Sequence, residues 1–137
     1  MEDKTFALIF TYNCFGGPYY KFFARWSYDD YTVRYHYECC YPDSTRMHSD
    51  DLNLYDNTEF LKKYDQLIAN KEETIVDPNT TFDIIHDAPM CQLVISEGLY
   101  FCDVEEWQVG NEFFDVKPLY DMILICDKEA TFLIEED

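Results

Sequence analysis

The chain has 137 residues, which suits one compact domain over residues 1–137 whose core needs neither a disulfide nor a metal. Hydrophobic residues make up 47% of it and aromatic residues 18%, which excludes a disordered acidic tail. Only 10 lysines and arginines stand against 28 aspartates and glutamates, and the formal charge of -18 opposes direct binding to nucleic-acid phosphates or to an anionic membrane.

The first part of the chain predicts β-strands. Residues 5–13 place apolar side chains on both faces, so this strand is expected inside a sheet. Residues 19–26 allow a second strand. Residues 31–40 alternate most cleanly, with tyrosine, valine and cysteine on one face and polar side chains on the other, and they predict a third strand. A polar loop is expected over residues 41–56.

An amphipathic helix is predicted next, over about residues 57–70. Its apolar side chains follow the spacing of a single helical stripe. They are Phe60, Leu61, Tyr64, Leu67 and Ile68.

The remainder predicts mainly strands. Short strands are expected within residues 74–86, and two hairpins over residues 91–104 and 122–134. The polar, aromatic connection over residues 105–120 leaves room for a short helix. The predicted fold class is α+β, a mostly antiparallel sheet of about six or seven strands with one main amphipathic helix packed on a face.

Charge is unevenly distributed along this sequence. Residues 1–46 contain six acidic and five basic residues, and they hold eight of the twelve tyrosines. Residues 47–137 contain 22 acidic and five basic residues, a net charge of -17. Like charges repel, so such an excess indicates either selection for solubility or a surface that meets a strongly basic partner.

The N-terminal sequence has neither the basic start nor the long apolar stretch of a secretory signal, and no window is apolar enough to span a membrane. The six cysteines are therefore expected to be reduced and mostly buried. These features together predict a cytoplasmic protein.

No motif in the sequence identifies an enzyme. The three histidines and six cysteines lack the spacing of a zinc site, and the phosphate-binding glycine motifs and the calcium-loop pattern are absent, so no metal or cofactor is expected. Two groups of residues nevertheless allow a catalytic alternative. Cys14 precedes two glycines, as a thiol nucleophile beside an oxyanion site would. Asp103 with Asp115 and Lys117 loosely resembles the magnesium-binding acids of a nuclease.

The remaining hypothesis is recognition of another protein. Acidic residues recur beside aromatic residues after position 100, and carboxylates can steer a basic partner while rings supply contact area. The predicted partner-binding residues are Asp103, Glu105, Glu106, Trp107, Glu112 and Asp115.

These features predict a stoichiometric acidic inhibitor that binds the basic active site or nucleic-acid channel of a nuclease or other nucleic-acid enzyme. Immunity proteins against nuclease toxins and phage DNA mimics or anti-CRISPR proteins have this general composition. No small-molecule ligand is expected. The alternative is a non-catalytic binding or adaptor domain that uses the tyrosine-rich N-terminal third, with the charge giving solubility alone.

Overall fold

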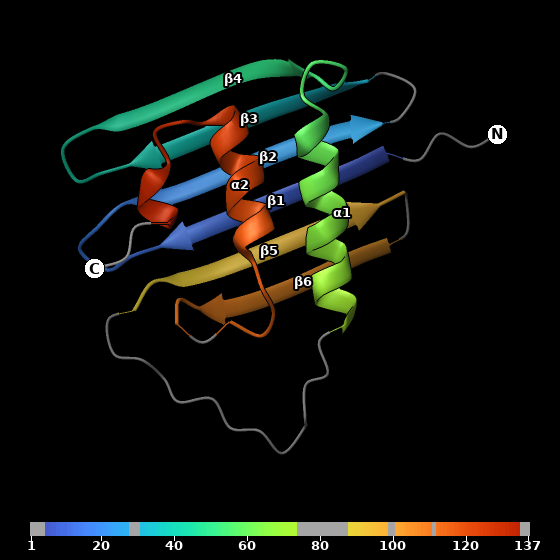
Figure 1. The fold of residues 1–137 in the computed structure, drawn as a ribbon. Helices are drawn as coiled ribbons and strands as arrows, with labels where there is room; N and C mark the ends of the chain where they lie inside the picture. Colours follow the sequence, from blue (N-terminus) through green and yellow to red (C-terminus); the bar gives the residue numbers. More distant parts are fainter. Residues whose placement is uncertain (1–4, 28–30, 74–87, 99–100, 111, 135–137) are drawn as a thin grey trace.

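The computed structural model describes residues 5–27, 31–73, 88–98, 101–110 and 112–134, and of residues 101 and 102 it describes the backbone only. Six strands form one open antiparallel sheet in the order β4-β3-β2-β1-β5-β6. Two helices and a short 3-10 turn lie across one face of this sheet (Figure 1). The elements are β1 (Thr5–Asn13), β2 (Tyr19–Ser27), β3 (Thr32–Cys40), β4 (Thr45–Asn53), α1 (Thr58–Glu73), β5 (Met90–Glu97), β6 (Phe101–Gln108), α2 (Lys117–Cys126) and the 3-10 turn η1 (Thr131–Leu133).

The predicted α+β class is confirmed, with a six-stranded antiparallel sheet and α1 as its main helix. The three predicted N-terminal strands are present as β1, β2 and β3, and the first predicted hairpin is formed by β5 and β6. The strands expected within residues 74–86 lie outside the described residues.

Two local predictions were wrong. Residues expected to form a polar loop include β4, an edge strand of nine residues whose side chains are mostly exposed. The second predicted hairpin, over residues 122–134, is instead the end of α2 followed by the turn η1. Pro118 in the first turn of α2 is a typical helix start, and the helix is apolar on more than one side because it is largely covered.

The core lies between the sheet and the helices. On α1, Tyr64 packs edge-on against Trp26 of β2 with ring centroids 4.9 Å apart, and on α2, Tyr120 packs against Phe10 of β1 at 6.1 Å. The two helices therefore cover opposite ends of the central strands. The largest fully buried side chains are Trp26, Tyr20, Phe10, Phe22, Phe60, Leu8, Leu67, Leu93, Ile95, Leu119, Met122 and Ile123.

One buried carboxylate connects the edge of the sheet to the helix layer. Asp127, directly after α2, accepts hydrogen bonds from the Tyr20 hydroxyl (2.9 Å) and from the Arg46 guanidinium (2.7 Å). Its side chain is 1% exposed, whereas that of Arg46 is 28% exposed. Arg46 belongs to β4 and lies over the Tyr37 ring, 5.2 Å from its centroid. Burial and the adjacent Asp127 carboxylate raise the pKa of Tyr20 far above its usual value, so its hydroxyl remains a donor.

We predict that Asp127→Ala lowers the free energy of unfolding by about 3 kcal/mol, because it leaves Arg46 and Tyr20 without their shared acceptor. Urea unfolding followed by circular dichroism measures the loss. The matched control is Glu59→Ala, which removes an exposed ion pair with Lys62 and should cost less than about 0.5 kcal/mol. Equal losses for the two variants would contradict a structural role for the buried carboxylate.

Candidate functional site

The six residues predicted to contact a partner come from the edge strand β6 and from the segment that follows it. Their side chains alternate across the sheet. Asp103 and Glu105 lie on the face that carries the helices, whereas Glu106 lies opposite Gln92 on the other face. Trp107 is 2% exposed and stacks on Phe10 with centroids 6.0 Å apart, so its ring belongs to the core and is not an exposed anchor.

A lysine from α1 holds the two carboxylates on the helix side. Lys71 Nζ forms an ion pair with Asp103 and lies 3.0 Å from Glu105 Oε1. Burial alone would lower the pKa of Lys71, but the hydrogen bonds to both carboxylates outweigh it and raise this pKa above its usual value. The ammonium therefore stays charged and fixes the end of α1 beside β6. One positive charge cannot balance two carboxylates, so the cluster keeps a negative excess.

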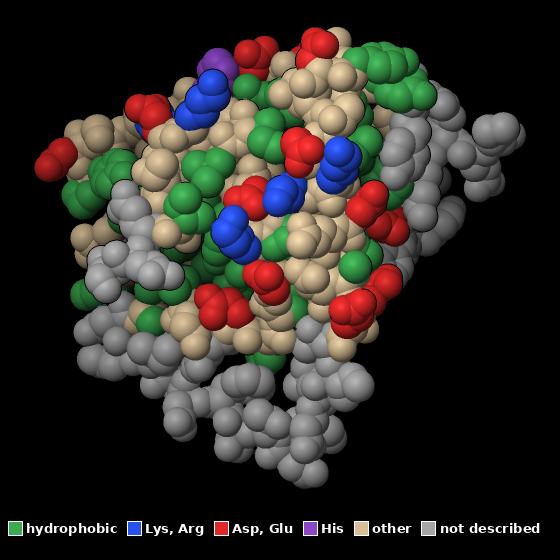
Figure 2. Space-filling model, in the orientation of Figure 1, with side chains coloured by type: hydrophobic (Ala, Val, Ile, Leu, Met, Phe, Trp, Pro, Cys, Tyr) green, Lys and Arg blue, Asp and Glu red, His purple; other side chains and the backbone are tan. Residues whose placement is uncertain are grey.

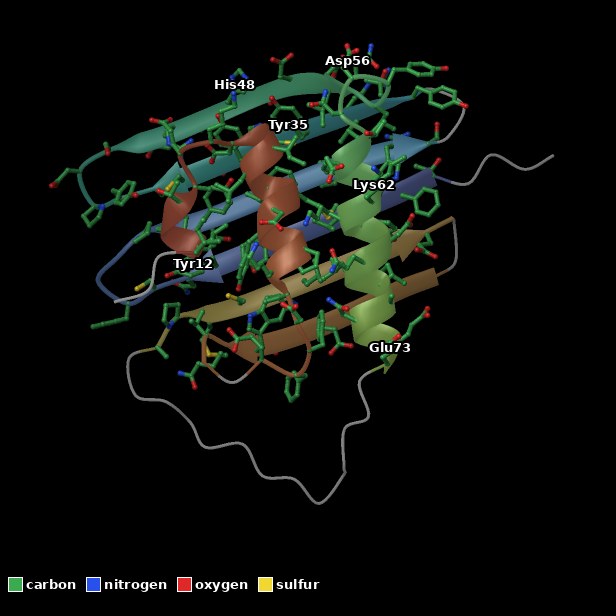
Figure 3. All side chains as sticks on the ribbon, viewed as in Figure 1. Tyr12, Tyr35, His48, Asp56, Lys62 and Glu73 are labelled. Carbon is green, nitrogen blue, oxygen red and sulfur yellow. The ribbon has the colours of Figure 1, made fainter. Side chains whose placement is uncertain are left out.

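More acid follows at the end of the same helix. Glu72 and Glu73 are exposed in the last turn of α1. Figure 3 shows Glu73 at the end of this helix. Carboxylates are unfavourable there because the helix dipole places partial negative charge at that end. We use the name β6 acidic edge for Glu72, Glu73, Asp103, Glu105 and Glu106.

Elsewhere on the helix side, three lysines of the two helices have acidic neighbours. Lys63 Nζ lies 3.2 Å from an Asp121 oxygen, and Lys117 Nζ lies 3.3 Å from the same carboxylate. Lys62 lies 3.4 Å from Glu59. In the space-filling view, acidic side chains surround the few basic ones on this face (Figure 2). These cations therefore compensate local carboxylates and leave the β6 acidic edge in excess.

The last two predicted residues lie at a separate place, a groove beside α2. Asp115 Oδ1 accepts the backbone N–H of Lys117 at 3.0 Å, and Glu112 Oε1 accepts that of Gly110 at 3.2 Å. Both carboxylates are exposed at a groove of about 430 Å³. The groove is lined by Val109, Glu112, Phe114, Asp115, Val116, Lys117, Tyr120, Leu133 and Ile134. We call it the Glu112–Asp115 groove.

The catalytic alternatives gain no geometric support. Asp103 is paired with Lys71, and Asp115 accepts a backbone hydrogen bond at the start of α2. Among the described residues, no group of three or more histidine, cysteine or acidic side chains is placed to hold a metal ion. Cys14 lies in a tight turn in which the Gly17 amide donates to the Cys14 carbonyl at 3.0 Å, so that amide is not free for an oxyanion.

One polar array was not anticipated from the sequence. On the sheet face opposite the helices, His36 Nδ1 lies 2.5 Å from Ser49 Oγ, and His36 Nε2 lies 3.0 Å from Glu38 Oε1. The order Ser49, His36, Glu38 resembles a nucleophile, a base and an orienting acid. The His36 and Glu38 side chains are, however, 38% and 37% exposed on the face of the sheet, where water reaches them. We assign the array to joining β4 to β3. It was missed because Ser49 was expected in a loop.

Comparisons with protein-family models, with curated proteins and with solved structures gave no match to this chain. Within the described part of the chain, no helix is long and apolar enough to cross a membrane. Function therefore has to be argued from the chemistry of the surfaces described above.

Thiol reactivity provides a direct test of the environment of the cysteines. Burial, with a smaller contribution from nearby acids, raises the pKa of Cys91 and of Cys126 to about 12. Alkylation requires the thiolate, whose fraction at pH 8 is about one ten-thousandth for such a group. We predict that iodoacetamide at pH 8 modifies the half-buried Cys14 well before Cys91 and Cys126, as measured by peptide mass spectrometry.

The control for this measurement is the same reaction in denaturing urea, where all three thiols should react at similar rates. In the folded protein, modification of Cys91 and Cys126 should increase as the pH rises toward 12. Rapid labelling of Cys91 at pH 8 would contradict the burial described here.

Proposed function

We propose that this chain is a stoichiometric protein inhibitor that binds the basic active site or nucleic-acid channel of a nucleic-acid enzyme. The observation that carries the proposal is the uncompensated acid of the β6 acidic edge, in a chain of formal charge -18. A carboxylate surface of this kind occupies the positions that phosphates would take in a basic channel. An immunity role against a nuclease toxin and a phage counter-defence role both fit this chemistry.

The placement of Glu72 and Glu73 supports the proposal over solubility alone. Exposed carboxylates improve solubility wherever they lie, yet these two lie at the end of a helix that disfavours them, next to Lys71, which binds Asp103 and Glu105 of β6. Their mutual repulsion destabilises the free protein and is relieved when a cationic surface binds.

The alternative, an adaptor domain with a tyrosine-rich contact face, has less support from the geometry. Tyr20 and Tyr37 are buried in the core. Among the described residues of this region, the exposed tyrosines are Tyr19, Tyr31 and Tyr41. Tyr19 and Tyr41 lie at one end of the β2–β3 pair, and Tyr31 lies at the other end. They do not share one strand face.

The proposal predicts a salt-sensitive partner. A tagged chain is used to capture proteins from its native host, with elution in rising salt and identification by mass spectrometry. We expect a basic nucleic-acid enzyme released at moderate salt, whose activity falls to its minimum at one molar equivalent of the chain. A neutral partner that survives high salt would favour the adaptor alternative, and a captured enzyme that keeps full activity would overturn the inhibitor proposal.

The location of binding is tested with two triple variants that remove equal charge. Glu72→Gln/Glu73→Gln/Glu106→Gln neutralises the β6 acidic edge, and Asp43→Asn/Asp51→Asn/Asp56→Asn neutralises exposed acids on and near the opposite edge strand β4. Stopped-flow association with the captured enzyme at low salt should slow about tenfold for the first variant and less than about twofold for the second. Equal slowing would mean that net charge alone, and not the β6 acidic edge, drives binding.

A further inference from the structure

The Glu112–Asp115 groove combines a mostly apolar lining with two carboxylates at its rim. Most of its lining residues are apolar or aromatic, and the Phe114 and Tyr120 side chains are buried, whereas Lys117 also lines the groove. Its rim carries the carboxylates of Glu112 and Asp115. A neutral apolar ligand would cover these carboxylates and remove them from water without a compensating partner, which is unfavourable. An anion would be repelled.

The matching ligand has an apolar stem and a cationic head. An arginine side chain has both, and its planar guanidinium can pair with a carboxylate through two hydrogen bonds while it stacks on an aromatic ring. Lysine offers the stem and the charge, but neither the planar surface nor the paired donors.

The carboxylates of the groove are held in place by the backbone. Each accepts one N–H, from Gly110 or from Lys117, and a carboxylate retains further lone pairs for a second donor. The nearest lysine is engaged elsewhere, because Lys117 Nζ lies 3.3 Å from both oxygens of Asp121. The rim is therefore preorganised to accept a cation supplied by another molecule.

The groove is also continuous with the β6 acidic edge. The Asn70 side chain donates a hydrogen bond to the Asp115 carbonyl at 3.1 Å, and the next residue, Lys71, binds Asp103 and Glu105. A basic protein that approaches the acidic edge thus meets the groove on the adjoining surface.

We infer that the Glu112–Asp115 groove binds an arginine side chain of the basic partner. The inference rests on the proposed function in that it identifies how the partner is anchored. The acidic edge attracts the partner at long range, and the groove takes up one arginine at short range.

The experiment titrates methyl-labelled chain with N-acetyl-arginine methylamide and follows methyl resonances by NMR. We expect saturable shifts concentrated at the lining residues Val109, Val116, Leu133 and Ile134. The matched control ligand is the citrulline analogue, which keeps the shape and removes the charge, and it should bind at least about fivefold more weakly. The same loss is expected for Glu112→Gln/Asp115→Asn, whereas Glu72→Gln/Glu73→Gln should leave groove binding within about twofold.

Three results would overturn the inference. The first is a shift of resonances over the whole acidic surface by the arginine probe without saturation at the groove. The second is equal binding of the citrulline analogue, and the third is unchanged binding by the groove variant. None of these outcomes depends on the enzyme partner. If salt-sensitive inhibition localised to the β6 acidic edge persists while the groove fails, the proposed function stands and only the anchor is wrong.

Discussion

The buried carboxylate of Asp127 is the constraint on which the arrangement of sheet and helices depends. It is the only charged side chain buried among the described residues, and it receives donors from β2 and from the edge strand β4. An ionised carboxylate is stable in such a place only when its lone pairs are used, so Arg46 and Tyr20 must stay where they are. Through them the segment after α2 is fixed against the sheet, and that segment continues into Leu133 and Ile134 of the groove.

A second electrostatic constraint operates at the other helix. The Lys71 ammonium is shared between Asp103 and Glu105, which connects the end of α1 to the edge strand β6. Both helices are thus joined to the sheet by ion pairs as well as by apolar contact, and these pairs use Lys71 and Arg46. The chain has 10 lysines and arginines for 28 aspartates and glutamates, so most of its negative charge is not neutralised by its own cations.

The sequence predicted the elements whose hydrophobic pattern reflects burial on one face. The strand over residues 31–40 and the helix over residues 57–70 both have a single apolar face, and both are present as β3 and α1. The strand β4 was missed because an edge strand with mostly exposed side chains has no such pattern, and its pairing is determined by β3. The apolar run at residues 122–126 was misassigned because a short, largely covered helix cannot be distinguished from a strand by periodicity alone.

The candidate site was predicted only in part, for a related reason. Sequence proximity suggested that Trp107 and its acidic neighbours share one surface, but in a strand consecutive side chains point to opposite faces. Trp107 consequently lies in the core, while Glu106 faces the other side of the sheet. The contacts that assemble the acidic surface join residues far apart in sequence, such as Lys71 with Asp103, and no spacing rule anticipates them.

Long-range attraction by charge and short-range anchoring make different demands on a binding surface, and the proposed function assigns them to two different parts of this molecule. Electrostatic steering of a basic partner needs exposed negative charge with few cations nearby, as at the β6 acidic edge. It tolerates mobile side chains because the electric field acts at a distance. Anchoring needs a rigid, partly apolar site, which mobile surface acids cannot provide. In the groove that rigidity comes from the backbone donors of Gly110 and Lys117 and from the packed rings beneath. Under the proposed function these two tasks would be divided between an edge strand and a groove, which the hydrogen bond from Asn70 to the Asp115 carbonyl connects.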